Sequence, residues 1–290
     1  MLVAVERQPT RSPGGSDGGA AGCFAGGAAA EEEGELLAGE EAGSVNSTHL
    51  GNSTHLGTLV IFFYGAQSVT FDFKNNCPYT VWPGTLTAAG GPSLSSTGFT
   101  LATGASSSLS VPVNWSGRLW ARTQCSTDAS GKFVCATADC ASGVIECNGA
   151  GAIPPASLAE FTLSGDGGKD YYDISLVDGF NLPISVTPQG GSTGCPSTSC
   201  AANVNAVCDP SLAVKGSDGT VIACKSACLA FNQPQYCCTG DHNTAETCPP
   251  TQYSMTFKQQ CPQAYSYAFD DKSSTFTCPS GGNYLITFCP

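Results

Sequence analysis

Cysteine is the residue type that offers the most chemistry in this 290-residue chain, which contains 17 of them. One, Cys23, stands apart near the start, and the other 16 lie between Cys77 and Cys289. An even number is what a framework of disulfides requires. No Cys-x-x-Cys pair occurs, which argues against zinc knuckles and thioredoxin-type redox chemistry. The spacing therefore indicates structural disulfides made in an oxidising compartment, and no metal site.

Other reactive residue types are scarce. The chain has three histidines, and only His242 lies in the cysteine-containing part. A Ser-His-Asp triad would need His242 to reach a distant serine, and no nucleophile-elbow motif is present. The glycine pairs at 90–91 and 190–191 lack the Lys-Ser/Thr of a phosphate-binding loop. We expect neither triad chemistry nor a nucleotide, and no cofactor.

The charge balance narrows the choice of partners. The formal net charge is −12, which argues against nucleic acid and anionic membrane surfaces as partners. Charged residues make up only 12% of the chain, while Gly (35) and Pro (18) are abundant. This composition favours a loop-rich, disulfide-stapled secreted protein over a cytosolic enzyme. No apolar stretch is long enough to span a bilayer, so no integral membrane association is expected.

The first 68 residues differ from the rest. Residues 1–55 contain Gly and Ala runs and an acidic run, a composition typical of a disordered leader. The apolar stretch 56–66 has the length of a signal-peptide core, and the small residues Ala66 and Ser68 predict cleavage after Ser68. The alternative is that 56–66 forms a buried first strand. A signal peptide so far from Met1 suggests an over-extended gene model or an unusual leader.

The remainder, 69–290, has the pattern of strands. Apolar and polar residues alternate in 69–74 and 109–113, and further strands are expected at 117–123, 172–177 and 284–288. The strand around 80–84 is expected to end in a Pro83-Gly84 turn. Strands do not alternate with long amphipathic helices, which argues against a barrel or doubly wound fold. The pattern predicts a mainly β protein with two packed sheets.

Two cysteine-rich segments interrupt these strands. Nine cysteines fall between Cys195 and Cys261, which indicates a disulfide-rich lobe inserted between strands. Within it, 223–231 is expected to form a short helix. A smaller group between Cys125 and Cys147 predicts a tight ribbon.

Several motifs resemble those of the thaumatin family. Residues 131–147 (GKFVCATADCASGVIEC) match the family signature at each constrained position. Residues 75–82 (NNCPYTVW), 173–181 (DISLVDGFN), 235–238 (QYCC) and 283–290 (NYLITFCP) each resemble a family segment. The resemblance covers 69–290. It implies a sandwich made of 69–122, 155–201 and 263–290, with a ribbon at 123–154 and a cysteine-rich lobe at 202–262.

The resemblance also implies a disulfide pairing that the sequence alone would leave open. The implied pairs are Cys77–Cys289, Cys125–Cys135, Cys140–Cys147, Cys195–Cys278, Cys200–Cys261, Cys208–Cys224, Cys228–Cys237 and Cys238–Cys248. Cys23 has no partner in this scheme, in agreement with its removal with the leader.

Members of this family are similar in having an acidic cleft lined by one Arg, one Glu and three Asp. The matching positions are Arg118, Glu160, Asp173, Asp178, and either Asp270 or Asp271. Adjacent strand residues point to opposite faces, so only one of Asp270 and Asp271 should enter the cleft. Asp173 and Asp178 differ in phase, so a turn or bulge before Gly179 must redirect Asp178.

Such a set of side chains suits sugar chemistry. Carboxylates accept hydrogen bonds from hydroxyls, and clustered carboxylates raise one another's pKa, so one can stay protonated beside an ionised neighbour. An acid and a base in one site are what glycoside hydrolysis requires. We expect Glu160 as general acid and Asp173 as nucleophile or base, with Arg118 keeping a neighbouring carboxylate ionised.

Aromatic and acidic residues near this set have further interpretations. Tyr171, Tyr172 and Phe180 are candidates for stacking on sugar rings. The alternative is structural: Arg118 forms an ion pair, and Asp173 and Asp178 cap turns. Asp139, inside the ribbon, is expected to be structural.

The resemblance implies a monomeric, secreted, extracellular (apoplastic) plant defence protein of pathogenesis-related group five, active against fungi. Its cleft would bind β-1,3-glucan of the fungal wall, with or without weak endo-hydrolysis. The rival hypothesis is a non-catalytic binding or inhibitor module against microbial hydrolases. Asn114-Trp115-Ser116 is a sequon, which predicts N-glycosylation at Asn114.

Overall fold

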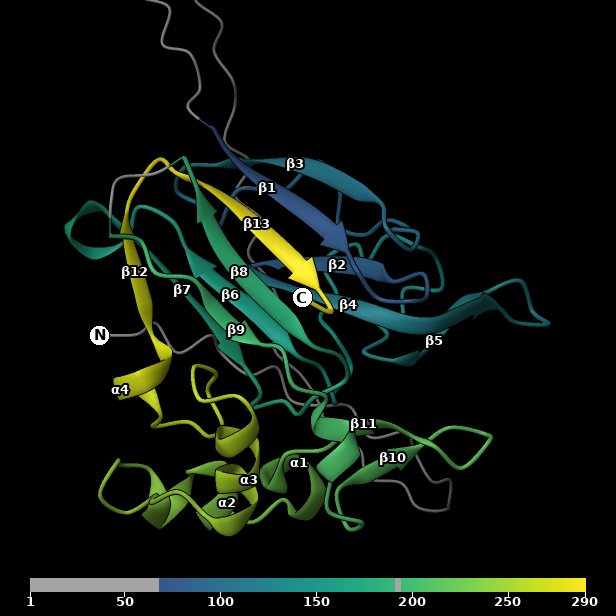
Figure 1. Ribbon diagram of the computed structural model, residues 1–290, viewed down its shortest axis with the longest axis vertical. Helices are drawn as coiled ribbons and strands as arrows, with labels where there is room; N and C mark the ends of the chain where they lie inside the picture. Colours follow the sequence, from purple (N-terminus) through teal and green to yellow (C-terminus); the bar gives the residue numbers. More distant parts are fainter. Residues whose placement is uncertain (1–67, 191–193) are drawn as a thin grey trace, which may run out of the picture. The chain divides into compact units, whose positions relative to one another are not determined.

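The computed structural model describes residues 68–190 and 194–290 (Figure 1). The predicted leader, 1–55, and all of the predicted signal region except Ser68 lie outside the described residues. The fold below is therefore that of the part expected to form the mature protein.

One sheet has five strands in the order β3-β1-β13-β8-β9. Their bounds are Ser68–Asn75 (β1), Ser106–Pro112 (β3), Ile184–Gln189 (β8), Thr198–Cys200 (β9) and Asn283–Phe288 (β13). The alternation predicted for β1 is confirmed, because Val69, Phe71 and Phe73 are buried while Thr70, Asp72 and Lys74 are half-buried. β1 pairs in parallel with β13, which places the first and last strands of the described chain side by side.

The second sheet has six strands. Its order is β12-β7-β6-β4-β2, with β5 pairing to β4. Their bounds are Trp82–Thr87 (β2), Ser116–Thr127 (β4), Phe133–Thr137 (β5), Leu158–Thr162 (β6), Lys169–Ser175 (β7) and Phe276–Pro279 (β12). The predicted ribbon is largely a continuation of this sheet, because β4 runs on to Thr127 and pairs there with β5.

Aromatic side chains fill the space between the sheets. The Phe71 ring of β1 lies 4.6 Å from Phe161 of β6, 5.7 Å from Trp115 and 5.9 Å from Tyr284, measured between ring centroids. Offset and edge-on contacts of this kind stabilise a core beyond the area that they bury. The fold is thus the mainly β sandwich that the sequence predicts.

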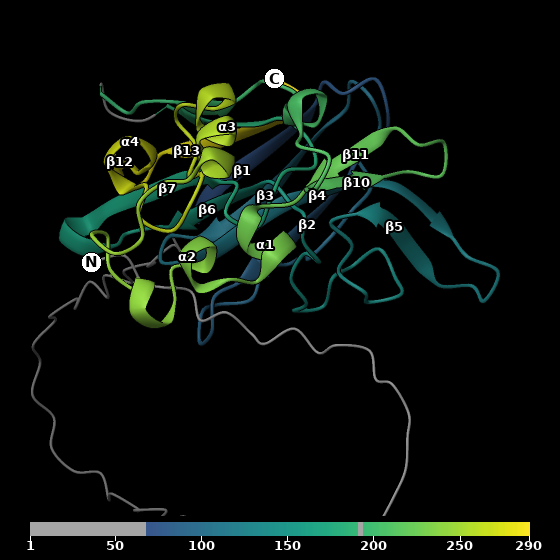
Figure 2. The ribbon, with the colours of Figure 1, turned by 90° about the horizontal axis from the view of Figure 1, so that it is seen from below.

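Most of the helices belong to the lobe, which we define as residues 202–262. In Figures 1 and 2, α1, α2 and α3 gather beside the sandwich and apart from its sheets. The lobe contains η2 (Val204–Val207), β10 (Ala213–Lys215), β11 (Val221–Cys224), α1 (Ala227–Phe231), α2 (Pro234–Cys237), η3 (Gly240–His242) and α3 (Gln252–Gln260). Outside it lie η1 (Asp166–Gly168) and α4 (Asp271–Ser274).

Two local predictions were wrong. The helix expected over 223–231 begins only at Ala227, because Ala223 and Cys224 belong to β11 and Cys224 also pairs with Phe180. The Ser226 hydroxyl accepts a hydrogen bond from the Leu229 N–H at 3.2 Å and caps the helix start.

Pro83-Gly84 is not a turn but lies within β2. β2 is the last strand of its sheet, where a proline is tolerated because one side of the backbone needs no donor. A Cβ at Gly84 would lie 2.7 Å from the Trp120 ring, so glycine is required by that ring.

The described residues form eight disulfides, which are the eight pairs that the resemblance implies. Cys77–Cys289 closes the longest loop, with a sequence separation of 212 residues. On the chain-entropy account, such a loop contributes on the order of 5 kcal/mol.

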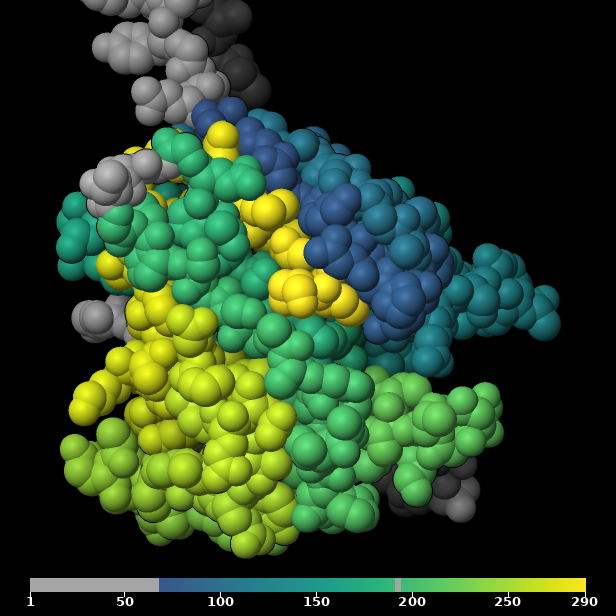
Figure 3. Space-filling view, viewed as in Figure 1, coloured from purple at the N-terminus to yellow at the C-terminus, as the bar shows by residue number. Residues whose placement is uncertain are grey.

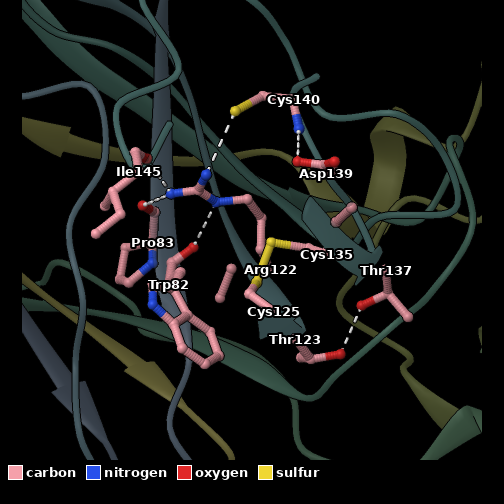
Figure 4. The surroundings of a disulfide bond; sticks show 12 residues. Trp82, Pro83, Arg122, Thr123, Cys125, Cys135, Thr137, Asp139, Cys140 and Ile145 are labelled. Carbon is pink, nitrogen blue, oxygen red and sulfur yellow. Dashed lines mark hydrogen bonds between the residues drawn. A yellow bond between two sulfur atoms is a disulfide. The ribbon is translucent and has the colours of Figure 1, made fainter. Parts of the chain in front are cut away.

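A buried arginine ties the ribbon to the sandwich (Figure 4). The Arg122 guanidinium donates to the carbonyl oxygens of Trp82, Pro83 and Ile145 at 3.1, 3.3 and 2.5 Å. It also lies 5.4 Å from the centroid of the Phe133 ring. Burial lowers the pKa of Arg122 to about 10, so the side chain stays charged at neutral pH.

Replacing this side chain should be costly. We expect Arg122→Met to lower the free energy of unfolding by about 3 kcal/mol, because three buried carbonyls lose a donor. Arg122→Lys should lose less, since an ammonium still offers donors. Chemical denaturation measures the free energy of unfolding of the parent and of both variants. If Arg122→Met is as stable as the parent, the hydrogen bonds of Arg122 contribute little.

Candidate functional site

Three predicted site residues lie in one row across the six-stranded sheet. Arg118 of β4 stands directly opposite Glu160 of β6, and Glu160 stands opposite Asp173 of β7. Their chain neighbours, such as Leu119 and Tyr172, point into the core. The row therefore lies on the face of the sheet away from the core, where opposite Cβ atoms are about 4.5–5.5 Å apart.

Asp178 joins this row through a turn. β7 ends at Ser175, and the Gly179 N–H donates to the Leu176 carbonyl at 2.9 Å. Gly179 has φ of 91°, a conformation that favours glycine. The turn brings Asp178 Oδ2 to 3.9 Å from Arg118 Nη1. This is the turn that the sequence required before Gly179.

Asp270 and Asp271 point in different directions. Asp270 Oδ2 receives hydrogen bonds from the N–H and hydroxyl of Ser266, both at 2.9 Å, and pairs with Lys258 Nζ at 2.9 Å. Asp271 Oδ1 instead accepts a hydrogen bond from the Tyr265 hydroxyl at 2.8 Å, and its charge acts on Asp173. Asp271 is thus the aspartate of this pair that joins the row. The side chains of Asp270 and Asp271 diverge at the start of α4, whereas the sequence argument assumed a strand.

We call Arg118, Glu160, Asp173, Asp178 and Asp271 the acidic cluster. Asp173 is its most buried carboxyl, with 7% of its surface exposed. Burial, followed by the charges of Glu160 and Asp271, raises the pKa of Asp173 well above its usual value. Within the described residues, its Oδ1 has no hydrogen-bond partner. The Oδ1 atom of Asp173 is therefore shielded from water, and the carboxyl group favours its protonated form.

A second buried carboxyl on the same strand shows the contrast. Asp170 is fully buried on the core face, and burial raises its pKa too. However, its Oδ1 accepts from the Ser164 N–H at 2.8 Å and its Oδ2 from the Tyr284 hydroxyl at 2.7 Å. Asp170 is satisfied by the protein and is structural, whereas Asp173 Oδ1 has no such partner among the described residues.

Tyr265 is a member of the site that sequence reasoning missed. Its backbone pairs with β7 through the Ile174 carbonyl and the Leu176 N–H, both at 2.8 Å. Its hydroxyl lies 2.5 Å from Thr275 Oγ1 and donates to Asp271. Burial raises the pKa of Tyr265, so it remains a neutral donor. No motif marks this tyrosine, and only its closeness to Asp270 in the chain hinted at it.

Two of the three aromatic stacking candidates were wrong. Tyr172 (1% exposed) and Phe180 (0%) lie in the core and cannot meet a sugar ring. Tyr172 points inward because it alternates with Asp173 along β7. Tyr171 is on the same face as Asp173 and is half-buried, so it alone of the three remains a candidate.

The other predicted positions lie away from the cluster. Asp139 Oδ1 accepts from the Cys140 N–H at 2.8 Å, a structural contact within the ribbon. Asn114 is exposed in the turn between β3 and β4. In the described ranges, no group of three or more His, Cys, Asp or Glu is arranged to hold a metal ion. None of the helices described is long and apolar enough to cross a membrane.

The sandwich, its disulfide-rich lobe and the acidic cluster define a thaumatin-like class of protein. Residues 75–290 match the model of the Thaumatin family, and the chain belongs to this family. A "Glucan endo-1,3-beta-glucosidase" of Prunus avium is 66% identical over 235 residues, which are 81% of this chain and 96% of that protein.

Two further proteins extend the comparison. "Pathogenesis-related protein 5" of Arabidopsis thaliana is 54% identical over 241 residues, covering 82% of this chain and 98% of that protein. The solved structure of a laminaripentaose-producing beta-1,3-glucanase in complex with laminaritetraose has a TM-score of 0.50 at 13% identity, covering 77% of this chain and 99% of that one. This last likeness is one of fold.

The raised pKa of Asp173 predicts a pH-dependent stability. An aspartate in the unfolded chain has a pKa of about 3.9. Because the folded pKa is higher, stability should fall as pH rises from about 4 through the folded value. Asp173→Asn removes this loss, so at pH 7 its Tm should exceed that of the parent by at least about 2 °C, the shift that 1 kcal/mol produces at this size.

The matched control is Asp209→Asn. Hydrogen bonds from Ser211 lower the pKa of Asp209, so this change should leave Tm at pH 7 equal or lower. Scanning calorimetry between pH 4 and pH 7 measures both variants. A Tm gain for Asp173→Asn that is the same at pH 4 and pH 7 would contradict the predicted titration.

Proposed function

We propose that the acidic cluster binds β-1,3-glucan and hydrolyses it slowly. The observation that carries the proposal is the Asp173 carboxyl, which is buried, raised in pKa and unpartnered at Oδ1, directly opposite Glu160. Paired carboxyls with different protonation are the requirement for cleaving a glycosidic bond. The name of the Prunus avium relative supports the same substrate class.

The roles follow from burial and charge. Asp173 keeps its proton and acts as general acid, giving it to the glycosidic oxygen as the carbon–oxygen bond breaks. Glu160 has Arg118 opposite it on β4 and acts as the carboxylate. This reverses the assignment expected from the sequence, in which Glu160 was the acid and Asp173 the nucleophile or base.

The spacing favours a retaining reaction. Glu160 and Asp173 are direct cross-strand neighbours, whose Cβ atoms are about 4.5–5.5 Å apart, so a close pair of carboxyls fits this register. Retaining glycosidases have carboxyls about 5–5.5 Å apart. Glu160 would attack the anomeric carbon and form a glycosyl ester. Water would then hydrolyse this ester, with Asp173 accepting the water's proton and so recovering its own.

The biological setting follows from the family. Its relatives include a plant protein named for pathogenesis. A secreted antifungal role for this chain, in which the cluster meets glucan of the fungal wall outside the plant cell, is part of the proposal. The eight disulfides support it, since disulfides persist outside the cytosol.

The test uses two assays on the purified protein. Reducing-sugar release from a linear β-1,3-glucan reports hydrolysis, and pull-down with insoluble β-1,3-glucan reports binding, with a β-1,4-glucan as the comparison polymer. We expect Asp173→Asn and Glu160→Gln each to lower release at least about 100-fold. Asp209→Asn, an exposed lobe carboxylate, should release sugar like the parent.

The outcomes separate the two parts of the proposal. Pull-down without sugar release would leave a glucan-recognition protein and overturn the hydrolytic part. If neither assay responds, the glucan proposal fails, and the inhibitor hypothesis becomes the one to test.

A further inference from the structure

Lys258, on the lobe helix α3, is fully engaged with one segment of the sandwich. Its Nζ donates to the Ala264 carbonyl at 3.0 Å and to Ser274 Oγ at 2.9 Å, and pairs with Asp270 Oδ2 at 2.9 Å. An ammonium has three N–H donors, so these three oxygens satisfy it. Its side chain is only 20% exposed, which makes the contacts stronger than those of a surface lysine.

The three acceptors span residues 264–274, which we call the bridging segment. Ala264 starts it, Asp270 lies within it and Ser274 ends it. Figure 1 shows α4, the last part of this segment, between β12 and the lobe helices, and Figure 3 shows yellow residues at the junction of sandwich and lobe. Lys258 therefore fixes both ends and the middle of the segment to α3.

The bridging segment carries two groups into the site. Tyr265 follows Ala264 directly, and Asp271 follows Asp270. Their side chains join each other at 2.8 Å and face Asp173. Each contact that Lys258 makes is thus one residue from a site group or, at Ser274, three residues from Asp271.

We propose that Lys258 is a positioning residue of the acidic cluster: from the lobe, it holds the bridging segment in the shape that keeps Asp271 and Tyr265 facing Asp173. A lobe residue thereby determines which side chains face Asp173 in a site that is built on the sandwich. The inference deepens the proposed glucan function and rests on it only for the effect on glucan binding.

A positioning role and a purely electrostatic role of Lys258 predict opposite changes in the pKa of Asp173 when Lys258 is removed. Asp173 is faced by Glu160 from β6, by Asp271 and Tyr265 from the bridging segment, and by the row that ends in Arg118. If Lys258 only supplied a positive charge, removing it would raise the pKa of Asp173. If Lys258 positions Asp271, removing it lets this carboxylate move away, and the pKa of Asp173 falls.

The experiment is a carboxyl-carbon NMR titration of the folded protein, with the Asp173 signal assigned by its loss in Asp173→Asn. In Lys258→Met, the pKa of Asp173 should fall measurably, because the Asp271 carboxylate that helps to raise it moves away. In Lys272→Met, which removes an exposed lysine from α4 itself, it should not fall. A rise or no change in Lys258→Met overturns the proposal.

A second variant guards against simple unfolding. Lys258→Met leaves Asp270 half-buried without its cation, which is destabilising by itself. Lys258→Met with Asp270→Asn removes both charges, and Asp270 is outside the acidic cluster. This double variant should fold and still show the fall in the Asp173 pKa, because the Ala264 and Ser274 contacts remain lost. A pKa restored to the parent value would overturn the positioning role.

Glucan pull-down on the same proteins separates the two proposals. We expect the double variant to bind β-1,3-glucan at least tenfold more weakly than the parent, with Lys272→Met unchanged. If the parent binds no glucan while the Asp173 pKa falls as stated, the proposed function fails and the positioning role holds. If glucan binding of the double variant equals that of the parent, the positioning of Asp271 has no role in recognition and that part of the inference is overturned.

Discussion

The antiparallel register of β4, β6 and β7 is the constraint on which the site depends. It places Arg118, Glu160 and Asp173 in one line across the sheet, on the face opposite the aromatic core. A shift by one residue in either pairing would send a charge into that core and bring Leu119, Phe161 or Tyr172 out of it. The hydrophobic core and the charged row therefore specify the same register, each by excluding the other's side chains.

Three buried ionisable side chains, Arg122, Asp170 and Asp173, offset the cost of burial in different ways. Arg122 donates to several carbonyls, and Asp170 has a donor for each oxygen, so the protein satisfies the hydrogen bonding of both groups. Asp173 has an oxygen without such a partner, and it avoids the cost of a buried charge by favouring its protonated form. Among the buried carboxyls of the described residues, the one with an unpartnered oxygen is thus the one that stands beside other acids.

Much of the architecture was predictable because it rests on patterns that are local in the chain. Alternation along β1 and an even cysteine count predicted the sandwich and its disulfides. The family resemblance implied which cysteines pair. Asp173 and Asp178 lie in one of those motifs, and Arg118 and Glu160 were expected from the positions that match the family's cleft residues. What could not be predicted depends on contacts between distant segments. Pro83-Gly84 lies inside a strand because Trp120 packs on it.

The same limit applies within the site. Asp270 is engaged by Lys258 and Ser266 while the charge of Asp271 acts on Asp173, and α4 replaces the strand whose alternation the sequence argument assumed. The proton on Asp173 depends on its depth and on charges from β6 and α4, neither of which is visible in the chain order. Tyr265 was missed for the same reason, since its role comes from pairing with β7.

The Cys77–Cys289 bond has a mechanical meaning as well as a thermodynamic one. β1 and β13 lie side by side and parallel, and the disulfide joins them just beyond their ends. A force that pulls Ser68 away from Pro290 would pass along β1 and across one sulfur–sulfur bond. Residues 78–288 would lie outside this load path. Only β1, the stretch before Cys77, can then be pulled from its neighbours β3 and β13, so the six-stranded sheet, the lobe and the charged row would keep their shape under tension.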